Sequence, residues 1–435
     1  MEVRKVAIAC QGGGMHGAFT CGVLDAILKV KEEEFSGALP VADTQRRFEI
    51  VGLSGTSAGA LNAFMVWYGL MTDGSLSGRF AEARRAVNHL WDVFQACKSG
   101  EVGMNWLTQS FYRLAELGVT LKQPNTVQFN DQILSLLRQW SAVENAIAPS
   151  SDFGEIRPEY YDFLALLRTC APKFVEIQAR LDAIANDKVR PRLLLGAVEV
   201  LSGRFEAFDS WSNPKVSPEQ RRTISYEAVA ASGTLPDLRR SQRIAGLKNS
   251  DGQDPLYWDG VFSQNPPVSQ FAARTARDDT PDEIWVVRIN PQKRDREPTT
   301  LASIEDRRNE LAGNLSLYQE LHAIQTVNKL STCLDDLAAI AGEGHENEAR
   351  LRELRTRFAS YKPIDIYMIT MHQDQAGLGV ASKFDRSPDF VTAMRRHGEM
   401  RAAQFLPLWL TKSPRLVAWP DGDALQRIDG GSLGS

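Results

Sequence analysis

The sequence has few cysteines and no pattern among them. They are odd in number, widely scattered and without C-x-x-C spacing, which argues against both a disulfide framework and a zinc site. We therefore expect buried, reduced thiols in a cytoplasmic protein. The five residues concerned are Cys10, Cys21, Cys97, Cys170 and Cys333.

Long apolar runs are also missing. The longest apolar block, Ala60 to Met71, falls well short of the roughly 20 residues of a membrane-spanning helix and is better explained as a core helix. The apolar stretch before Gly12 is too short for the central region of a signal peptide. We expect a cytoplasmic location, with any membrane contact peripheral.

Neither an excess of positive charge nor a metal-binding pattern is present. The net charge is -4, so no nucleic-acid partner is expected. The histidines show no metal-ligand spacing, and the sequence predicts neither a metal nor a cofactor. With 435 residues, the chain is long for one compact domain and predicts a large core with a helical elaboration, or two domains.

Strand-like and helical segments alternate along the chain. This alternation predicts an α/β fold of three layers, α/β/α, around a mostly parallel sheet. We expect a catalytic domain at 1–295 with a helical insertion at about 79–187, a C-terminal helical extension at 296–429 that returns one strand (364–370), and a disordered tail at 430–435. The predicted strands are Lys5–Ala9, Phe48–Leu53, Arg192–Val200, Arg204–Phe208, Ile284–Ile289 and Ile364–Thr370, and the longer predicted helices are Ala18–Val30, Ala60–Leu70, Phe80–Cys97, Phe129–Ala148, Tyr160–Ala185, Leu301–Tyr361 (broken near Gly342) and Asp389–Leu410.

One junction between a strand and a helix carries the pattern G-x-S-x-G. Ser57 stands between Gly55 and Gly59, where the apolar strand ends and a helical segment begins. A nucleophile elbow needs this context, because the serine hydroxyl must project from a sharp turn above the edge of the sheet. An ordinary small-residue turn explains the stretch equally well when it is considered alone.

A glycine-rich loop joins the first strand to the first helix. Its sequence, Gly12-Gly13-Gly14-Met15-His16-Gly17, fits the dinucleotide-binding pattern G-x-G-x-x-G. That pattern expects an acidic residue about 20 positions later at a strand end, whereas a solvated charge run, Lys31 to Glu34, occurs here. The loop is better explained as an oxyanion hole that serves Ser57 through its backbone N–H groups.

A serine nucleophile needs a base, and the sequence offers two. Asp259 begins an Asp-Gly turn after two aromatic residues, although such turns are common without any function. The alternative is a triad of Ser57, Asp259 and His372, in which the histidine follows a predicted strand. Hydrolases with that triad place several strands before the nucleophile, but only two precede Ser57 here.

Taken together, these motifs resemble those of the patatin-like phospholipase family, specifically its bacterial members. The resemblance covers residues 5 to about 290, leaving the helical insertion and the chain after about 300 unmatched. It rests on four segments in the family's order: the glycine loop from Gly12 to Gly17, the elbow from Gly55 to Gly59, the segment from Ala231 to Pro236, and Asp259-Gly260 with Asn265-Pro266-Pro267.

The resemblance implies a lipid acyl hydrolase (a phospholipase A or lysophospholipase-like esterase) that works through a Ser–Asp dyad and an acyl-enzyme. It implies Ser57 as nucleophile and Asp259 as general base, with no metal or cofactor. The oxyanion hole would be formed by Gly12, Gly13, Gly14 and Met15, and the turns would be supported by Gly55, Gly59 and Gly260.

Two positions depart from the family pattern. His16 stands where the family usually has Arg or Lys, and Val261 where it usually has Gly or Ala. Neither departure removes a reacting group.

A rival interpretation is a non-catalytic scaffold in which the fold is kept for binding. Within the insertion, a candidate cap, we expect the aromatic residues Trp91, Phe94, Trp106, Phe111 and Tyr112 to belong to the core.

Overall fold

The computed structural model describes most of the chain. The described residues are 1–39, 44–72, 75, 78–119, 132, 135, 136, 139, 155–183, 191–211, 216–236, 239–272, 278–341, 350, 353, 354, 356, 362–371 and 378–420. The predicted tail at 430–435 and His372 lie outside them, as does nearly all of the helix predicted for 129–148.

One sheet of eight strands forms the centre of the molecule, in the order β5-β6-β3-β2-β1-β7-β8, with β4 paired to β3. The five strands β3-β2-β1-β7-β8 are all parallel to one another, as the alternating sequence predicted. The strands are β1 (Glu2–Cys10), β2 (Arg46–Gly55), β3 (Arg192–Glu199), β4 (Phe205–Asp209), β5 (Gln242–Arg243), β6 (Leu256–Asp259), β7 (Glu283–Arg288) and β8 (Asp365–Thr370).

The antiparallel part of the sheet lies at one side. β4 and β6 both run antiparallel to β3, and β5 runs antiparallel to β6. The β3–β4 hairpin was predicted from its turn, but β5 and β6 were not. β5 has only two residues and β6 only four, so neither is long enough to show a strand periodicity.

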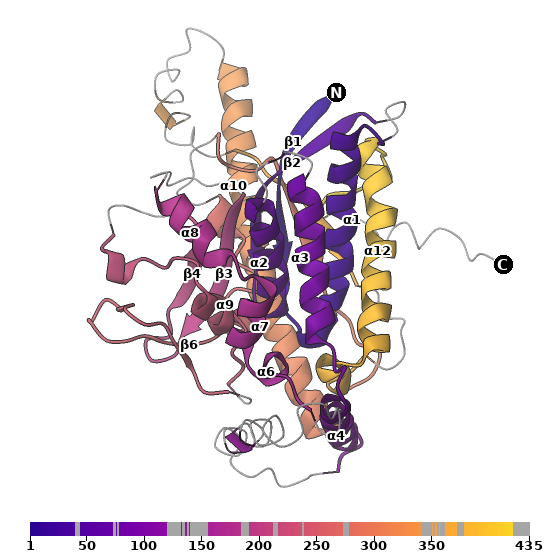
Figure 1. The fold of residues 1–435 in the computed structure, drawn as a ribbon. Helices are drawn as coiled ribbons and strands as arrows, with labels where there is room; N and C mark the ends of the chain where they lie inside the picture. Colours follow the sequence, from indigo (N-terminus) through magenta and orange to yellow (C-terminus); the bar gives the residue numbers. More distant parts are fainter. Residues whose placement is uncertain are drawn as a thin grey trace, which may run out of the picture.

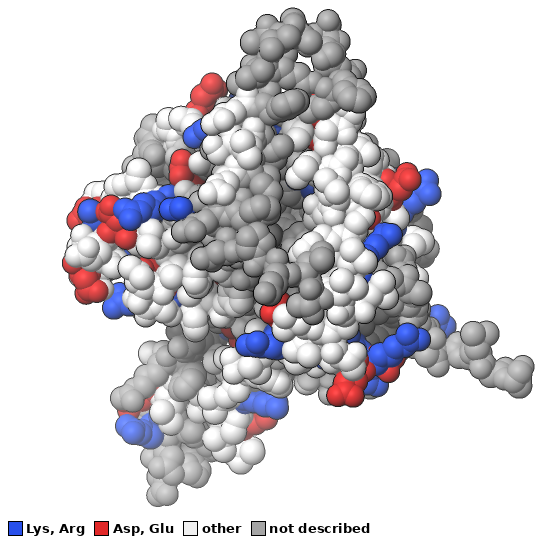
Figure 2. Space-filling view, turned by 90° about the horizontal axis from the view of Figure 1, so that it is seen from below, with Lys and Arg blue, Asp and Glu red and all other residues white. Residues whose placement is uncertain are grey.

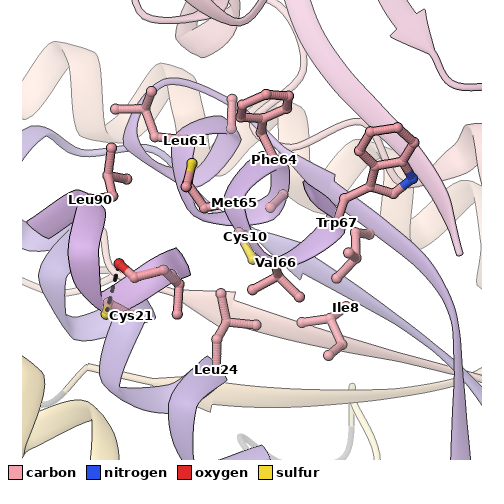
Figure 3. Close-up of a cluster of buried hydrophobic side chains, with 14 of the residues drawn as sticks. Ile8, Cys10, Cys21, Leu24, Leu61, Phe64, Met65, Val66, Trp67 and Leu90 are labelled. Atoms are coloured by element: carbon pink, nitrogen blue, oxygen red, sulfur yellow. Dashed lines mark hydrogen bonds between the residues drawn. The ribbon is translucent and has the colours of Figure 1, made fainter. Parts of the chain in front are cut away.

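Helices cover both faces of the sheet and make three layers (Figure 1). Alternate residues of β1 enter two different cores: Val6 and Ile8 pack with the helices α1, α2, α3 and α12, and Ala7 packs with α10 on the other face. Because both faces are buried, the central strands are apolar throughout. Figure 3 shows part of the first core, where Leu24, Met65 and Leu90 belong to one cluster with Ile8 and Cys10 of β1.

The described helices are α1 (Gly17–Ser36), α2 (Ala58–Thr72), α3 (Gly78–Phe94), α4 (Ser99–Glu116), α6 (Pro158–Tyr161), α7 (Phe163–Cys170), α8 (Phe174–Ala183), α9 (Tyr226–Ser232), α10 (Leu301–Ala341) and α12 (Pro388–Leu410), with 3-10 turns η1 (Gly14–His16), η2 (Pro218–Gln220), η3 (Gly260–Phe262), η4 (Ser269–Phe271) and η5 (Ala381–Phe384). None of the described helices is both long and apolar enough to cross a membrane.

The stretch Tyr160–Ala185 is mostly helical, as predicted, but it is not one continuous helix. Three short helices, α6, α7 and α8, occupy this range. Asp162 leaves the helical conformation and its side chain caps α7 by accepting a hydrogen bond from the Leu164 N–H at 2.9 Å. Pro172 lies between α7 and α8 and cannot donate a helical hydrogen bond.

Two predictions of burial fail at individual residues. Trp106 was expected in the core with Trp91, yet Trp106 on α4 is 66% exposed while Trp91 on α3 is fully buried. Of the five free thiols, Cys97 and Cys333 are exposed and the other three are buried. Cys97 lies in the connection between α3 and α4, and Cys333 lies on an outward side of α10, so neither position faces a sheet.

Candidate active site

Two strands end opposite each other along one edge of β3. β2 pairs with β3 at Arg192–Leu195, β6 pairs with it at Ala197–Glu199, and β4 shares β3 residues with both. A strand has two edges, and at any one residue each edge pairs with one neighbour. Because β4 overlaps both β2 and β6 along β3, β4 occupies one edge of β3, and β2 and β6 follow each other along the opposite edge. Gly55 of β2 pairs with Leu195 and Asp259 of β6 with Ala197, so the turn after β2 meets the end of β6.

Ser57 occupies the turn between β2 and α2 in a left-handed conformation. Its φ is 58°, which is uncommon for a residue with a side chain and is typical of strained turns at functional sites. The turn is tight: a Cβ placed on Gly55 would lie 2.2 Å from the Gly59 carbonyl oxygen, and one on Gly59 would lie 2.1 Å from that of Cys10. Both glycines are therefore required by close backbone approach.

A single segment holds both Ser57 and Asp259 by their backbones. The Ser57 N–H donates to the Ser232 carbonyl oxygen at 3.0 Å and lies 3.2 Å from Ser232 Oγ. The Asp259 N–H donates to the Thr234 carbonyl oxygen at 2.8 Å. Ser232 Oγ in turn donates to the Gly196 carbonyl oxygen at 2.6 Å. The sequence singled out this segment, Ala231 to Pro236, without giving it this role.

Asp259 is fully buried, and burial raises the pKa of its carboxyl group to about 7. The Ser57 hydroxyl and the Val261 N–H, which donates to Oδ1 at 2.9 Å, both act to lower this pKa. Oδ2 has no hydrogen-bond partner within the described part of the chain. A carboxyl group with this pKa, beside a hydroxyl, can exchange protons near neutral pH.

The glycine loop lies directly against Ser57. A Cβ placed on Gly12 would lie 2.6 Å from Ser57 Cβ, and one on Gly14, whose φ is 61°, would lie 2.4 Å from the Lys383 carbonyl oxygen. The Gly13 N–H, at the start of η1, donates no hydrogen bond within the described part of the chain. Unpaired N–H groups at such a start can bind a negatively charged oxygen.

Four buried amide side chains contact the glycine loop or one another beside it, and we did not predict these contacts, although Asn265 belongs to a segment that the sequence singled out. The Gly12 N–H donates to Asn265 Oδ1 at 2.7 Å, and its carbonyl oxygen accepts from Asn290 Nδ2 at 3.1 Å. Gln11 Nε2 donates to Asn314 Oδ1 at 2.9 Å. Asn290 follows a predicted strand directly, and a polar residue at the carboxyl end of a parallel strand is a signal that could have found it.

Both departures from the family pattern leave the site intact. His16 is buried and contacts Ser382 Oγ through Nε2 at 2.8 Å. Burial, together with the nearby positive charge of Lys383, lowers the pKa of His16 to about 3, so its imidazole is neutral. Val261 acts on Asp259 through its backbone N–H, which any residue except proline would supply.

No described histidine hydrogen-bonds to Ser57 or Asp259. The described residues also contain no group of three or more His, Cys, Asp or Glu side chains that could hold a metal ion.

The site lies at the end of the molecule to which β1 and β2 run, the lower end in Figure 1. Figure 2 shows this end, where basic and acidic residues are interspersed and no broad patch of one sign is visible.

Comparison with known families agrees with this arrangement. The family model for patatin-like phospholipase matches residues 8–272, which is more than half of the chain and includes the glycine loop, Ser57 and Asp259. The chain belongs to the patatin-like phospholipase family. Membership in this family points to a hydrolase that acts on lipid acyl groups.

The other comparisons are less informative. Among solved structures, the chain is similar to VipD from Legionella pneumophila at 13% identity, with 93% of this chain and 67% of that chain covered and a TM-score of 0.33. That likeness is too weak to bear on the fold. Comparison with the curated proteins gave no match.

Proposed function

We propose that the protein hydrolyses fatty-acyl ester bonds of lipids through a Ser57–Asp259 dyad and an acyl-enzyme intermediate. The observation that carries the proposal is the meeting of a strained serine turn, a fully buried carboxyl group and a glycine loop at one end of the sheet. A serine hydroxyl next to a base and facing free N–H donors is the arrangement that acyl transfer needs.

In the first half of the reaction, ionised Asp259 accepts the Ser57 proton as the serine oxygen bonds to the ester carbonyl carbon. The carbonyl oxygen becomes an oxyanion, held by N–H groups of the glycine loop at Gly13, Gly14 and Met15. The Gly12 N–H, which the sequence also offered, already donates to Asn265 Oδ1. The ester C–O bond then breaks, and the departing alcohol takes the proton from Asp259. The acyl group remains bonded to Ser57.

In the second half, water replaces the alcohol. Asp259 accepts a proton from the water while the water oxygen bonds to the acyl carbon. The same N–H groups hold the new oxyanion. The bond to Ser57 breaks, the serine oxygen takes the proton back from Asp259, and the fatty acid leaves. Every proton passes through one carboxyl group, so no histidine or metal is needed in this scheme.

The proposed substrate is a lipid. The protein would reach it from the cytoplasm through peripheral contact with a membrane. Support comes from α4, which packs against η5, which in turn packs against η1 of the glycine loop. Several apolar side chains of α4 are exposed, among them Trp106, Leu107 and Leu114. Exposed apolar residues on one helix near the site would suit contact with lipid. We keep the insertion at 79–187 as a candidate cap on this basis.

The test is an assay of the wild type, Ser57→Ala and Asp259→Asn with a chromogenic acyl ester and a panel of lipids read by mass spectrometry. Each variant should lose at least about a thousandfold in kcat because each removes a group that acts in both half-reactions. A fluorophosphonate probe should label Ser57 in the wild type and not in Ser57→Ala.

His372→Ala is the control that separates the dyad from the triad, and it should keep its activity. Full activity in Asp259→Asn together with loss in His372→Ala would falsify the dyad. If the folded wild type takes no label at Ser57, the protein is the non-catalytic scaffold instead. A rise in melting temperature on adding NAD would revive the dinucleotide interpretation of the glycine loop.

A further inference from the structure

We propose that Asn290 is a positioning residue that orients the Gly12–Gly13 peptide group, and with it the Gly13 N–H, toward the oxyanion. The inference rests on the proposed function. Asn290 lies just after β7 and beyond residue 272, where the match to the family model ends. Its role therefore comes from contacts in this chain and not from the matched motifs.

The first step concerns the direction of one peptide group. Asn290 Nδ2 donates to the Gly12 carbonyl oxygen at 3.1 Å in a buried hydrogen bond. The Gly12–Gly13 peptide bond is trans, so its C=O and its N–H point in opposite directions. Holding the carbonyl oxygen toward Asn290 thus turns the Gly13 N–H to the opposite side, away from the amide.

The second step concerns what lies on that opposite side. Gly12 contacts Ser57 so closely that a Cβ on Gly12 would lie 2.6 Å from Ser57 Cβ. On the other side of the loop, a Cβ on Gly13 would lie 3.2 Å from Asn290 Oδ1. The loop is thus held between the serine turn and Asn290. Glycine gives its backbone no stiffness of its own, so an outside group must fix this peptide.

The third step concerns how Asn290 is held. It is 4% exposed, and its backbone N–H donates to Gln11 Oε1 at 2.9 Å. Gln11 is fixed by Asn314 of α10, whose own Nδ2 donates to the Pro291 carbonyl oxygen at 2.9 Å. α10 can come this close because it carries glycine here: a Cβ on Gly313 would lie 2.6 Å from Asn265 Nδ2. These contacts leave Asn290 little freedom to move.

Asn290→Asp is the decisive variant because it keeps the shape of the side chain but replaces the donor with a carboxylate, which repels the Gly12 carbonyl oxygen. We expect kcat on a chromogenic ester to fall by about 10- to 100-fold with KM within about threefold, because removal of a whole oxyanion donor costs about 10²–10³. The rate of Ser57 labelling by a fluorophosphonate, in which an O–P bond forms and fluoride leaves, should fall by a similar factor.

The matched control is Asn328→Asp on α10. Asn328 makes the same kind of contact far from the loop: its Nδ2 donates to the Ile364 carbonyl oxygen at 2.8 Å and its Oδ1 accepts from the Ile364 N–H at 3.1 Å. It should leave kcat and labelling within about twofold of the wild type, since only general stability is affected. Melting temperatures of both variants are measured alongside.

The outcomes separate the two proposals. Equal kcat in folded Asn290→Asp and the wild type, or equal losses in Asn290→Asp and Asn328→Asp, overturns the role of Asn290 alone. A wild type without label at Ser57 overturns the proposed function and this role with it. If Asn290→Asp does not fold, Asn290→Ala removes the donor without adding a charge and is judged by the same split between kcat and KM.

Discussion

At the scale of single residues, the site is a set of largely buried polar groups. Asp259 is fully buried and Ser57 is 8% exposed. Desolvation disfavours the ionised carboxylate, and the Ser57 hydroxyl and the Val261 N–H offset this only in part. Asp259 is therefore a stronger base than an exposed aspartate. The neighbouring His16 stays neutral for the same reason, because burial disfavours its charged form.

The raised pKa of Asp259 predicts the pH dependence of activity. The base must be ionised to accept the serine proton, and with a pKa of about 7 it is protonated in acid. We expect kcat/KM to rise about tenfold per pH unit below pH 7 and to level off above it. Initial rates with a soluble ester between pH 5 and 9 measure this. A plateau that extends down to pH 5 would mean that the base is an unshifted carboxylate.

At the scale of elements, close contacts between backbones set the geometry of the serine turn. α2 begins at Ala58 and packs against the end of β1, and Gly59 allows this approach. β1 is held by β2 on one side and β7 on the other, so it cannot retreat from a larger residue. The position of Ser57 thus depends on the absence of a side chain two residues later.

Substitution of this glycine tests the contact. A Cβ at Gly59 would lie 2.1 Å from the Cys10 carbonyl oxygen, so Gly59→Ala should lower the free energy of unfolding by about 2–3 kcal/mol. Gly103→Ala in α4 is the matched control, because nothing lies within 4 Å of a Cβ placed there, and it should stabilise by about 0.5–1 kcal/mol. Urea unfolding measures both, and similar effects at the two glycines would refute the packing argument.

At the scale of the whole molecule, the chain after the family match completes the sheet and adds a helix to each of its two faces. β8 pairs with β7 along its whole length, and α12 packs on α1. The two helices are in close contact: a Cβ on Gly22 would lie 2.0 Å from the Arg395 carbonyl oxygen, and one on Gly398 would lie 2.0 Å from that of Phe19. α10 covers the opposite face of the sheet.

Truncation tests how far the region 1–295, proposed as the catalytic domain, depends on the extension at 296–429. A chain that ends at residue 295 loses α10, β8 and α12, which leaves α1 and β7 uncovered. We expect it to lose cooperative thermal unfolding and near-UV circular dichroism and to bind ANS. A chain shortened only by the predicted tail, 430–435, should melt like the full chain. Cooperative melting of 1–295 would establish it as an independent unit.

Local signals in the sequence were enough to predict the fold class and to single out the two glycine-rich turns of the candidate site. A strand, a glycine-rich turn and a helix lie next to one another in the chain, so the glycine loop and the turn at Ser57 could be recognised from contiguous residues. The alternation of strand-like and helical segments indicated a three-layer fold, and the structure has helices on both faces of the sheet.

Only the tertiary structure decided which distant residues meet. The hydrogen bond between Gln11 and Asn314 joins residues 303 positions apart, and that between Gly12 and Asn290 joins residues 278 apart. A lone asparagine has no periodicity that marks it as buried. The exposure of Trp106 depended in the same way on which side of α4 faces the protein. Segment type follows from local conformational preference, whereas burial and partners follow from packing among elements that the chain order does not fix.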